Sequence, residues 1–301
     1  MTPNRRTLAA TAHAEGRGLF TNLPASLTLH PAEPGSGLNV SRAGEDPILV
    51  HISTLSDDVP HPAFQRLPPR CTTLGLNSGP LFTVEHALSA LVGLGITDAL
   101  LEVTGPELPI LDGSAAPFVE AIRAAGLTEL DASADPLIVT EELTIADDRG
   151  GSVRVTPADD TRYTYHLDYA TADASRPAPI PAATATWDAT PDDYAANVAP
   201  ARTYALQSEA EQMHALGLFQ HLTPRDMLVI APATKDTHGG PIDNAYRFEG
   251  EPARHKLLDL IGDLALVGRP IQAHIAAHRS GHALHHQVAR ALVARFGHTG
   301  N

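Results

Sequence analysis

Apolar and polar positions alternate along the chain in two distinct ways. Period-two alternation predicts half-buried β-strands, and apolar positions three and four apart predict amphipathic helices. In the first half the strand-like runs are 26–30, 48–53 and 99–105, and the helix-like runs are 82–95 and 115–127. In the second half strand-like runs, expected to form an antiparallel sheet, are 137–145, 151–157 and 163–170, and helices follow. Because the order repeats, the pattern predicts an α+β fold of two similar domains, each a sheet layered against helices.

Polar stretches that contain proline separate these blocks. Residues 127–136 are polar and end in proline, which is typical of a domain boundary, so we expect domains at 1–130 and 136–301. Residues 171–193 are rich in Ala, Pro, Thr and Asp and are predicted to be a surface excursion. Residues 231–243 are predicted to be a loop for the same reason.

Composition indicates a soluble globular protein and disfavours several function classes. The 301 residues include 21 Lys+Arg and 35 Asp+Glu, a formal net charge of −14. This acidity argues against a non-specific nucleic-acid binder or a protein of anionic membranes. The chain has no run of 18 apolar residues and no apolar signal core near its start, so we expect no membrane span and a cytoplasmic location.

Cysteine usage limits both the redox compartment and the metal chemistry. Cys71 is the single cysteine, so no intrachain disulfide can form, which is compatible with a reducing cytoplasm. A cysteine-rich zinc site is also excluded. Any bound metal must therefore be held by histidine and carboxylate side chains.

Residues 252–270 carry a polar stripe on an otherwise apolar helix pattern. His255, Asp259 and Asp263 recur every four positions and so share one helix face. Leucine and isoleucine cover most of the remaining circumference, so the helix is expected to be largely buried. Buried carboxylates are costly unless they are paired or bind a metal. The stripe favours a metal-dependent enzyme, and the alternative is a hydrogen-bonded structural pair or a solvated face.

Glu85 and His86 form a second candidate pair at the start of the helix-like run 82–95, where Thr83 is the predicted N-cap. The imidazole could bind a metal while the carboxylate accepts a proton from metal-bound water. The alternative is that Glu85 complements the helix dipole and His86 is a satisfied, half-buried histidine.

Other short patterns supply a turn, a hydroxyl and an acid. Residues 112–114 (Asp-Gly-Ser) predict a structural turn that caps the next helix. Thr203 offers a hydroxyl near the end of a polar segment, and His282 follows a Ser-Gly turn and could act as a general acid. His285 and His286 are predicted to lie solvated on the following helix. Two histidines, a carboxylate, a base and an acid are together the equipment for hydrolysing an amide or an ester.

Five motifs occur in order between residues 83 and 284, within a resemblance that runs from about residue 5 to residue 295. They are TVEHALSALVGLGI, PELPILDGSAAPFV, ARTY, RFEGEPARHKLLDLIGDL and RSGHAL. These motifs resemble the UDP-3-O-acyl-N-acetylglucosamine deacetylase (LpxC) family, the zinc enzymes of lipid A biosynthesis. The resemblance implies two similar layered domains with the active site between them, and a UDP-linked acylated amino sugar as the small-molecule substrate.

The resemblance also implies a role for individual residues. The implied zinc ligands are His86, His255 and Asp259, with ferrous iron as the other candidate metal. Glu85 would be the general base. His282, held by Asp263, would steady the oxyanion and protonate the departing amine, and Thr203 would donate to the acetamide oxygen.

Cationic and aromatic residues flank the motifs and could contact the nucleotide. Lys256 resembles a substrate contact that offsets anionic charge, and Tyr204 matches an aromatic position near the nucleotide. Arg279 and Arg202, with Arg254, could seat a diphosphate despite the acidity of the whole chain.

The chain departs from the usual family pattern outside the predicted zinc ligands and catalytic groups. Phe20 stands where the family usually has histidine, and residues 205–231 lack the usual Gly-Gly-Ser run in the acyl-chain passage. His285 replaces an asparagine. These departures indicate a divergent member.

The sequence leaves other functions and the oligomeric state open. One alternative is a deacetylase of the same chemistry that acts on another N-acetylated nucleotide sugar. Another is a non-catalytic binding or regulatory protein on the same scaffold. A hydroxyacyl dehydratase, an activity sometimes fused to this family, would need a second catalytic domain, which is not expected here.

Overall fold

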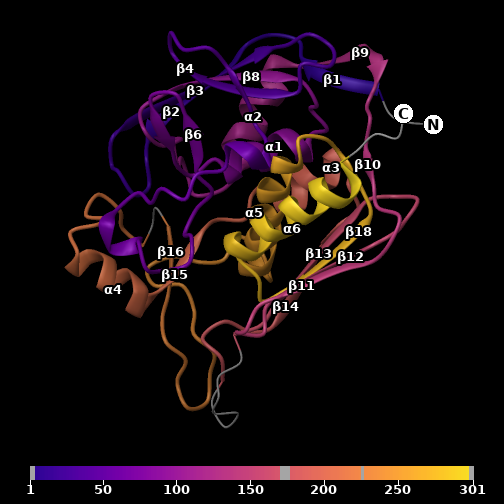
Figure 1. Cartoon of the computed structure of the whole chain (residues 1–301). Helices are drawn as coiled ribbons and strands as arrows, with labels where there is room; N and C mark the ends of the chain where they lie inside the picture. Colours follow the sequence, from indigo (N-terminus) through magenta and orange to yellow (C-terminus); the bar gives the residue numbers. More distant parts are fainter. Residues whose placement is uncertain (1–3, 170–176, 225–226, 298–301) are drawn as a thin grey trace.

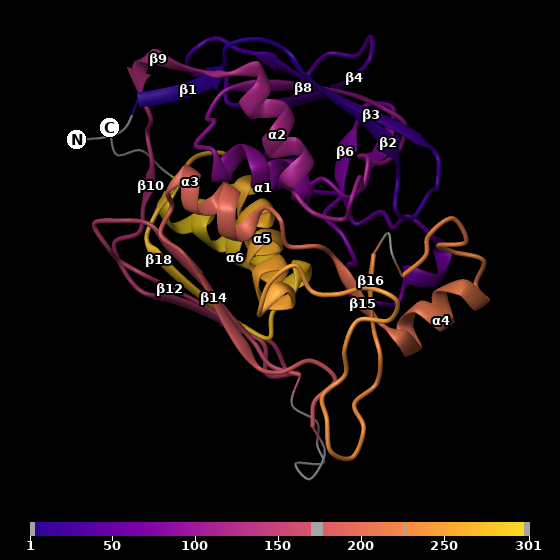
Figure 2. The ribbon, with the colours of Figure 1, turned by 180° about the vertical axis from the view of Figure 1, so that it is seen from behind.

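The computed structural model describes residues 4–169, 177–224 and 227–297. Within these ranges, two five-stranded sheets enclose layers of helices (Figure 1). The enclosed helices are α1 (Glu85–Gly93), α2 (Ala116–Ala125), α5 (Glu251–Leu264) and α6 (His282–Phe296). The opposite view shows the same layers, with α2 against the first sheet and α6 against the second (Figure 2).

The first sheet belongs to the N-terminal half. Its strands are β2 (Ala12–Arg17), β3 (Pro24–Pro31), β4 (Leu38–Arg42), β5 (Ile48–Leu49) and β8 (Ala99–Thr104). They lie in the order β2-β3-β8-β4-β5, and neighbours are antiparallel except for the parallel pair β4 and β8. Every second residue of β3 from Ala25 to Leu29 is buried, so the period-two pattern places one face on the core.

The second sheet belongs to the C-terminal half. Its strands are β11 (Leu143–Ala146), β12 (Ser152–Thr156), β13 (Arg162–Leu167), β14 (Ala183–Trp187) and β18 (His274–His278). They lie in the order β11-β12-β18-β13-β14. The expected antiparallel sheet is wrong at one pair, because β13 and β18 are parallel. Parallel neighbours need a long crossover, and the chain makes it through α5.

The two sheets have the same topology. Counted in chain order, the strands of each lie as first, second, fifth, third and fourth, with the third and fifth parallel. In each half one enclosed helix, α1 or α5, comes before the last strand, and another, α2 or α6, comes after it. The prediction of a duplicated α+β unit is confirmed, and α1 and α5 are equivalent helices.

Helix α5 begins and ends close to where the sequence predicts. It follows Gly250, whose φ of 70° is left-handed, and has Pro252 in its first turn. A 3₁₀ turn, η4 (Ala265–Val267), extends it to the left-handed Gly268. All residues of α5 except Arg254 and Lys256 are buried, as its apolar pattern predicts.

Smaller elements complete the fold. The remaining strands are β1 (Asn4–Leu8), β6 (Leu74–Leu76), β7 (Gly79–Leu81), β9 (Leu127–Ser133), β10 (Leu137–Ile138), β15 (Tyr204–Leu206), β16 (Leu228–Ile230) and β17 (Ile271–Gln272). The remaining helices are η1 (Ile52–Thr54), η2 (Pro62–Phe64), α3 (Pro191–Asp193), the π-helical η3 (Tyr194–Val198) and α4 (Gln207–Ala215). The unit β15-α4-β16 lies to one side of the layers (Figure 1). Across the described ranges, no helix has the length and apolar character needed to cross a membrane.

Several local expectations change in the structure. The strand-like run 48–53 is a strand only to Leu49, after which η1 begins. The polar segment 127–136 contains β9, which pairs with β1 rather than forming an unpaired linker. In the predicted surface excursion, residues 171–176 lie outside the described ranges, but 183–187 form β14, whose Ala185 and Trp187 are buried against the core. Long-range pairing thus overrides a turn-rich composition.

The main apolar core runs through both halves of the molecule. It includes Leu88 and Leu91 of α1 and Leu257, Leu258 and Ile261 of α5. The two helices touch closely. A Cβ added at Gly262 of α5 would lie 2.1 Å from the carbonyl oxygen of Glu85, the first residue of α1. The absence of a side chain there allows α1 and α5 to pack backbone against backbone.

Replacing Gly262 with alanine should therefore destabilise the fold. The new Cβ would meet the carbonyl oxygen and carbon of Glu85, which are backbone atoms and cannot rotate away. We expect Gly262→Ala to lower the free energy of unfolding by about 1–3 kcal/mol, measured by urea denaturation. Gly240→Ala, where a Cβ would meet nothing within 4 Å, is the control. Equal stability of the two variants would contradict the close crossing.

Candidate active site

Three predicted metal ligands meet where α1 crosses α5. His86 is the second residue of α1, and His255 and Asp259 lie one turn apart on α5. The Oδ1 atom of Asp259 lies 3.4 Å from Nε2 of His255 and 3.8 Å from Nε2 of His86. The two imidazole rings are perpendicular, with centroids 5.1 Å apart. Each residue offers one ligand atom, and these atoms all lie within 4.8 Å of one another.

The bonding around these side chains fits a divalent metal. Zinc bonds to nitrogen and oxygen are about 2.0–2.2 Å long, so ligand atoms roughly 3–4 Å apart can share one ion. Nδ1 of His255 bonds to the carbonyl oxygen of Ala201 at 3.0 Å, which leaves Nε2 free to bind metal. Nδ1 of His86 is buried and finds no hydrogen-bond partner among the described residues. Burial lowers the pKa of His86 to about 3, so its imidazole is neutral, as a ligand must be.

Asp259 presents one carboxylate oxygen to His86 and His255 and the other to the ammonium group of Lys256. Its Oδ2 accepts a hydrogen bond from Nζ of Lys256 at 2.8 Å. Burial alone would raise the pKa of Asp259, but the neighbouring His255 and Lys256 hold it well below the usual range. The carboxylate is therefore ionised. Lys256, which the resemblance marks as a substrate contact, also neutralises the buried carboxylate of Asp259.

Glu85 lies beside the ligands in the first turn of α1. Its side chain is buried, and its Oε2 accepts a hydrogen bond from the backbone N–H of Thr72 at 3.0 Å. Burial raises the pKa of Glu85 to about 8, the range of an effective general base. The predicted N-cap is wrong. Thr83 has a left-handed φ of 58°, the cap position is Val84, and the Thr83 hydroxyl donates to Glu107.

Asp263, one turn beyond Asp259, holds two histidines of α6. Its Oδ2 accepts from Nδ1 of His282 at 2.8 Å and from Nδ1 of His285 at 2.7 Å. These three residues also have metal-ligating atom types close together, but their nitrogens already share one oxygen through hydrogen bonds. Burial lowers the pKa of His282, yet the charge of Asp263 and its hydrogen bond outweigh burial and raise it to about 9. His282 is thus cationic at neutral pH.

The structure adds residues that the sequence pattern did not reveal. Thr72, fully buried in a loop before β6, donates its hydroxyl to Asp263 and therefore accepts from Nε2 of His286 at 2.8 Å. The prediction that His285 and His286 are solvated is wrong, because they are 0% and 5% exposed. No local pattern marks Thr72, since an isolated threonine in a loop is ordinary and its partners are distant in sequence.

Thr203 and Tyr204 line the side of the site beyond His255. Thr203 is half-buried, and no described residue hydrogen-bonds to its hydroxyl, although its backbone N–H donates to Gly113. The Tyr204 ring lies 6.2 Å from the His255 ring and 5.9 Å from Nζ of Lys256. Tyr204 therefore packs next to the candidate metal ligand His255.

The two predicted phosphate-binding arginines have different surroundings. Arg202 is buried and pairs with Glu251, with Nε 2.8 Å from Oε1, and its guanidinium also donates to the Ala245 carbonyl. These donors are used inside the protein, and a contact of Arg202 with substrate stays a prediction. Arg279 is exposed, and its nearest carboxylate, that of Asp168, lies 4.0 Å away. Arg279 keeps the freedom to contact an anion.

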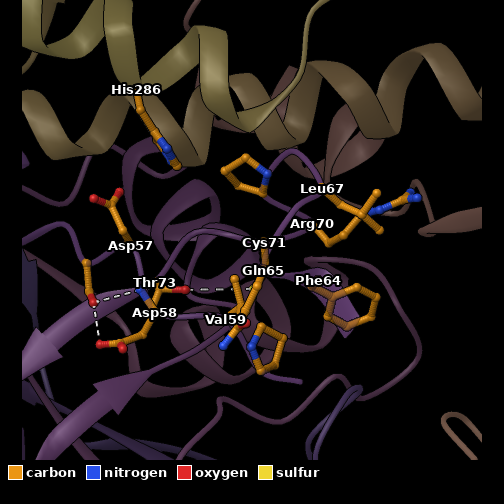
Figure 3. A pocket seen from close by; sticks show the side chains of 13 residues that line it. Asp57, Asp58, Val59, Phe64, Gln65, Leu67, Arg70, Cys71, Thr73 and His286 are labelled. Atoms are coloured by element: carbon orange, nitrogen blue, oxygen red, sulfur yellow. Dashed lines mark hydrogen bonds between the residues drawn. The ribbon is translucent and has the colours of Figure 1, made fainter. Parts of the chain in front are cut away.

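A cleft of about 210 Å³ lies beside His286, one of the histidines near Asp263. The loop from Ser56 to Thr73 forms most of its wall, and His286 reaches into it from α6 (Figure 3). None of the metal-ligand candidates lines this cleft. The cleft therefore reaches His286, which is linked to Asp263 through the Thr72 hydroxyl.

Comparison with known proteins places the chain in a family. A family model described as UDP-3-O-acyl N-acetylglycosamine deacetylase (LpxC) matches residues 5–294. The chain belongs to this family. A UDP-3-O-acyl-N-acetylglucosamine deacetylase of Thermosynechococcus vestitus is 36% identical, over 96% of this chain and 93% of its own length. Those of Myxococcus xanthus and Leptospira biflexa are 34% and 30% identical, over 97% and 99% of this chain and 87% and 92% of their own lengths.

Membership of the LpxC family confirms the resemblance carried by the five motifs. It identifies the chain as a hydrolase of the deacetylase type, with an α+β fold of two similar layered halves. The groups of histidine and carboxylate side chains in the structure agree with a metal-dependent enzyme.

Removing the carboxylate ligand should cost the protein its metal. We expect Asp259→Ala to lose bound zinc, because only two imidazoles would remain at the crossing of α1 and α5. Metal content after dialysis, measured by plasma mass spectrometry, tests this. Asp160→Ala removes a carboxylate that also pairs with a histidine, at 2.6 Å, but is exposed, and serves as the control. Equal zinc in both variants would refute the ligand role of Asp259.

Proposed function

We propose that this chain hydrolyses the 2-acetamido group of UDP-3-O-acyl-N-acetylglucosamine, releasing acetate and the free amine, as a step of lipid A biosynthesis. The observation that carries the proposal is the meeting of His86, His255 and Asp259 beside the buried Glu85, with His282 nearby. The family match and the names of the relatives supply the substrate class.

The donor set favours zinc as the metal. Two imidazoles and one carboxylate, with a fourth position for water or substrate, are typical of catalytic zinc. The same ligands also suit ferrous iron, which is the alternative metal. When bound, the cation would lower the pKa of the attacking water and polarise the acetamide carbonyl.

Glu85 is suited to take the proton of the attacking water. It neighbours the ligand His86 in the chain, and Thr72 fixes one of its oxygens by a backbone hydrogen bond. Its raised pKa gives it affinity for a proton, and a nearby cation would lower that pKa so that the carboxylate is ionised at neutral pH.

His282 and Thr203 are suited to stabilise the developing charge and the leaving group. His282 is cationic because Asp263 faces it, so it can first steady the oxyanion and then give its Nε2 proton to the departing amine. The Thr203 hydroxyl, which has no partner among the described residues, can donate to the acetamide oxygen. Asp263 keeps the His282 ring oriented.

Groups around the site suit an anionic, acylated sugar. Arg279 and Lys256 can offset diphosphate charge, and Tyr204 offers an aromatic face. A second apolar cluster adjoins the site. Its member Cys71 directly precedes Thr72 in the chain, and Ala205, which packs against the cluster, directly follows Tyr204. Its buried members are Leu19, Phe20, Phe64, Cys71, Phe82, Ile110, Met213, Leu218, Phe219 and Met227. This cluster is an apolar region beside the site that could receive an acyl group.

One observation favours the alternative substrate, an N-acetylated nucleotide sugar that carries no 3-O-acyl chain. The Phe20 ring lies 5.5 Å from the Phe64 ring and 5.5 Å from the Phe219 ring. These contacts fill the second apolar cluster, so an acyl chain would have to displace an aromatic ring to enter it.

We also propose a cytoplasmic location. The single cysteine, Cys71, is buried and free, and burial raises the pKa of its thiol, so it does not serve as a reactive or disulfide-forming group. A chain without disulfides suits a reducing compartment.

Acetate release tests the reaction and the base together. Zinc-loaded protein should release acetate from UDP-3-O-acyl-N-acetylglucosamine, and Glu85→Ala should slow release by about 10²–10⁴-fold because proton transfer is lost. Activity on UDP-N-acetylglucosamine equal to that on the acylated substrate would favour the alternative. No release from either substrate by protein with bound zinc would overturn the proposed function, and an unchanged rate in Glu85→Ala would remove Glu85 as the base.

The pH profile tests the acid. His282 must be protonated to act, so the rate should fall above pH 9, near its pKa of about 9, while protonation of Glu85 limits the rate at acid pH. His282→Ala should lower the rate and flatten the alkaline limb. His166→Ala, at an exposed histidine of β13, should leave the profile unchanged. A His282 variant that kept the alkaline limb and full rate would exclude His282 from the mechanism.

A further inference from the structure

The motif that contains Asp112 takes no part in the reaction described above, yet it connects the two halves of the molecule beside the site. Asp112 belongs to the loop before α2, and its Oδ2 lies 2.7 Å from Nη2 of Arg247, which belongs to the loop before α5. Each of these two side chains is 34% exposed. Nη1 of Arg247 also donates to the carbonyl oxygen of Pro200 at 2.9 Å. Arg247 thus contacts both the Asp112 loop and the segment that leads to Thr203.

The Asp112 turn is itself hydrogen-bonded to that segment. Oδ1 of Asp112 accepts from the backbone N–H of Ser114 at 3.0 Å, and Gly113 has a left-handed φ of 81°, which glycine adopts without strain. This turn directs the Gly113 carbonyl at the backbone N–H of Thr203, with 2.7 Å between nitrogen and oxygen. Ala115 N–H donates in turn to the Ala199 carbonyl at 2.9 Å. The turn and residues 199–203 therefore pair along their backbones.

The other side of residues 199–203 is fixed from helix α5. Glu251, the first residue of α5, is fully buried, pairs with Arg202 and accepts from the backbone N–H of Arg247 at 2.7 Å. The Ala201 carbonyl accepts from the ligand His255 at 3.0 Å. Residues 199–203 therefore carry two groups of the site, the Ala201 carbonyl that orients His255 and the Thr203 hydroxyl. This segment is held by hydrogen bonds from both halves of the molecule.

We propose that Arg247 is a positioning residue, whose ion pair with Asp112 closes a clamp on residues 199–203 and keeps the Thr203 hydroxyl in place for the acetamide oxygen. The proposal rests on the proposed function through the role of Thr203. Glu251 and His255 anchor residues 201 and 202 to α5. The Thr203 N–H instead bonds to the turn at Gly113 in the other half, and its carbonyl accepts from Leu228. The Arg247–Asp112 pair joins that turn to the α5 side. Its loss should therefore disturb Thr203 more than the metal ligands.

A double-mutant cycle tests whether the clamp acts through Thr203. Arg247→Met should lower kcat for acetate release by about 10- to 100-fold, with KM and bound zinc little changed, because a small displacement of a catalytic group costs rate. In a Thr203→Ala background, Arg247→Met should change kcat by less than about threefold, since the group it positions is gone. Asp112→Asn should reproduce the Arg247→Met effect, and the double variant should be no worse than either.

The matched control is an ion pair of the same type in another place. Arg123 of α2 pairs with Asp192 of α3 at 2.9 Å, so it also joins the two halves, but its side chain is 47% exposed and it contacts no site residue. Arg123→Met should leave kcat within about twofold of the wild type. Independent, additive effects of Arg247→Met and Thr203→Ala would overturn the proposal.

Hydrogen exchange tests the clamp without any substrate. The amides of Ala115 and Thr203 donate across the clamp, so Arg247→Met should speed their exchange with deuterium, and Arg123→Met should not. Unchanged exchange in Arg247→Met would overturn the clamp, whatever the activity. If the wild type releases no acetate, the proposed function fails, while the exchange rates still decide whether Arg247 holds the segment.

Discussion

The close packing of helix α1 against helix α5 is the constraint on which the rest of the structure depends. The two helices are equivalent members of a duplicated unit, and they meet with the backbone of Glu85 against Gly262. This approach brings His86 within reach of His255 and Asp259, although each half alone holds only part of this candidate ligand set. A side chain at position 262 would push the helices apart, and the three side chains would no longer lie so close together.

The crossing is buried, so each charge in it needs a partner. Asp259 faces Lys256, and Asp263 accepts hydrogen bonds from the histidines of α6. Unpaired, such carboxylates would cost several kcal/mol each. The same burial and pairing separate the proton affinities of neighbouring groups. Glu85 is buried beside other carboxylates and its pKa rises, whereas His282 gains a proton because Asp263 is ionised. A carboxyl group with a raised pKa and a cationic imidazole can thus coexist beside the cluster of His86, His255 and Asp259.

The two halves differ in what they insert before their equivalent helices, and these insertions complete the site. The insertion before α1 contributes Thr72, which bonds to Glu85 and to Asp263, the partner of His282. The insertion before α5 contributes Thr203 and Tyr204, held against the Asp112 turn of the other half. The duplicated framework places the candidate metal ligands, and the unequal insertions place hydrogen-bond donors around them.

The sequence by itself determined the features that depend on short-range geometry, such as which residues share one face of a helix. The four-residue spacing of His255, Asp259 and Asp263 put them on one face of a helix, and the apolar surround indicated that this face is buried. Contacts between distant segments were decided only by the tertiary structure. It pairs Arg202 with Glu251, buries the histidines that follow His282, and brings in Thr72, which no local pattern marks. Periodicity encodes the direction of a side chain from its own element, whereas its partner depends on how that element packs against others far away in the chain.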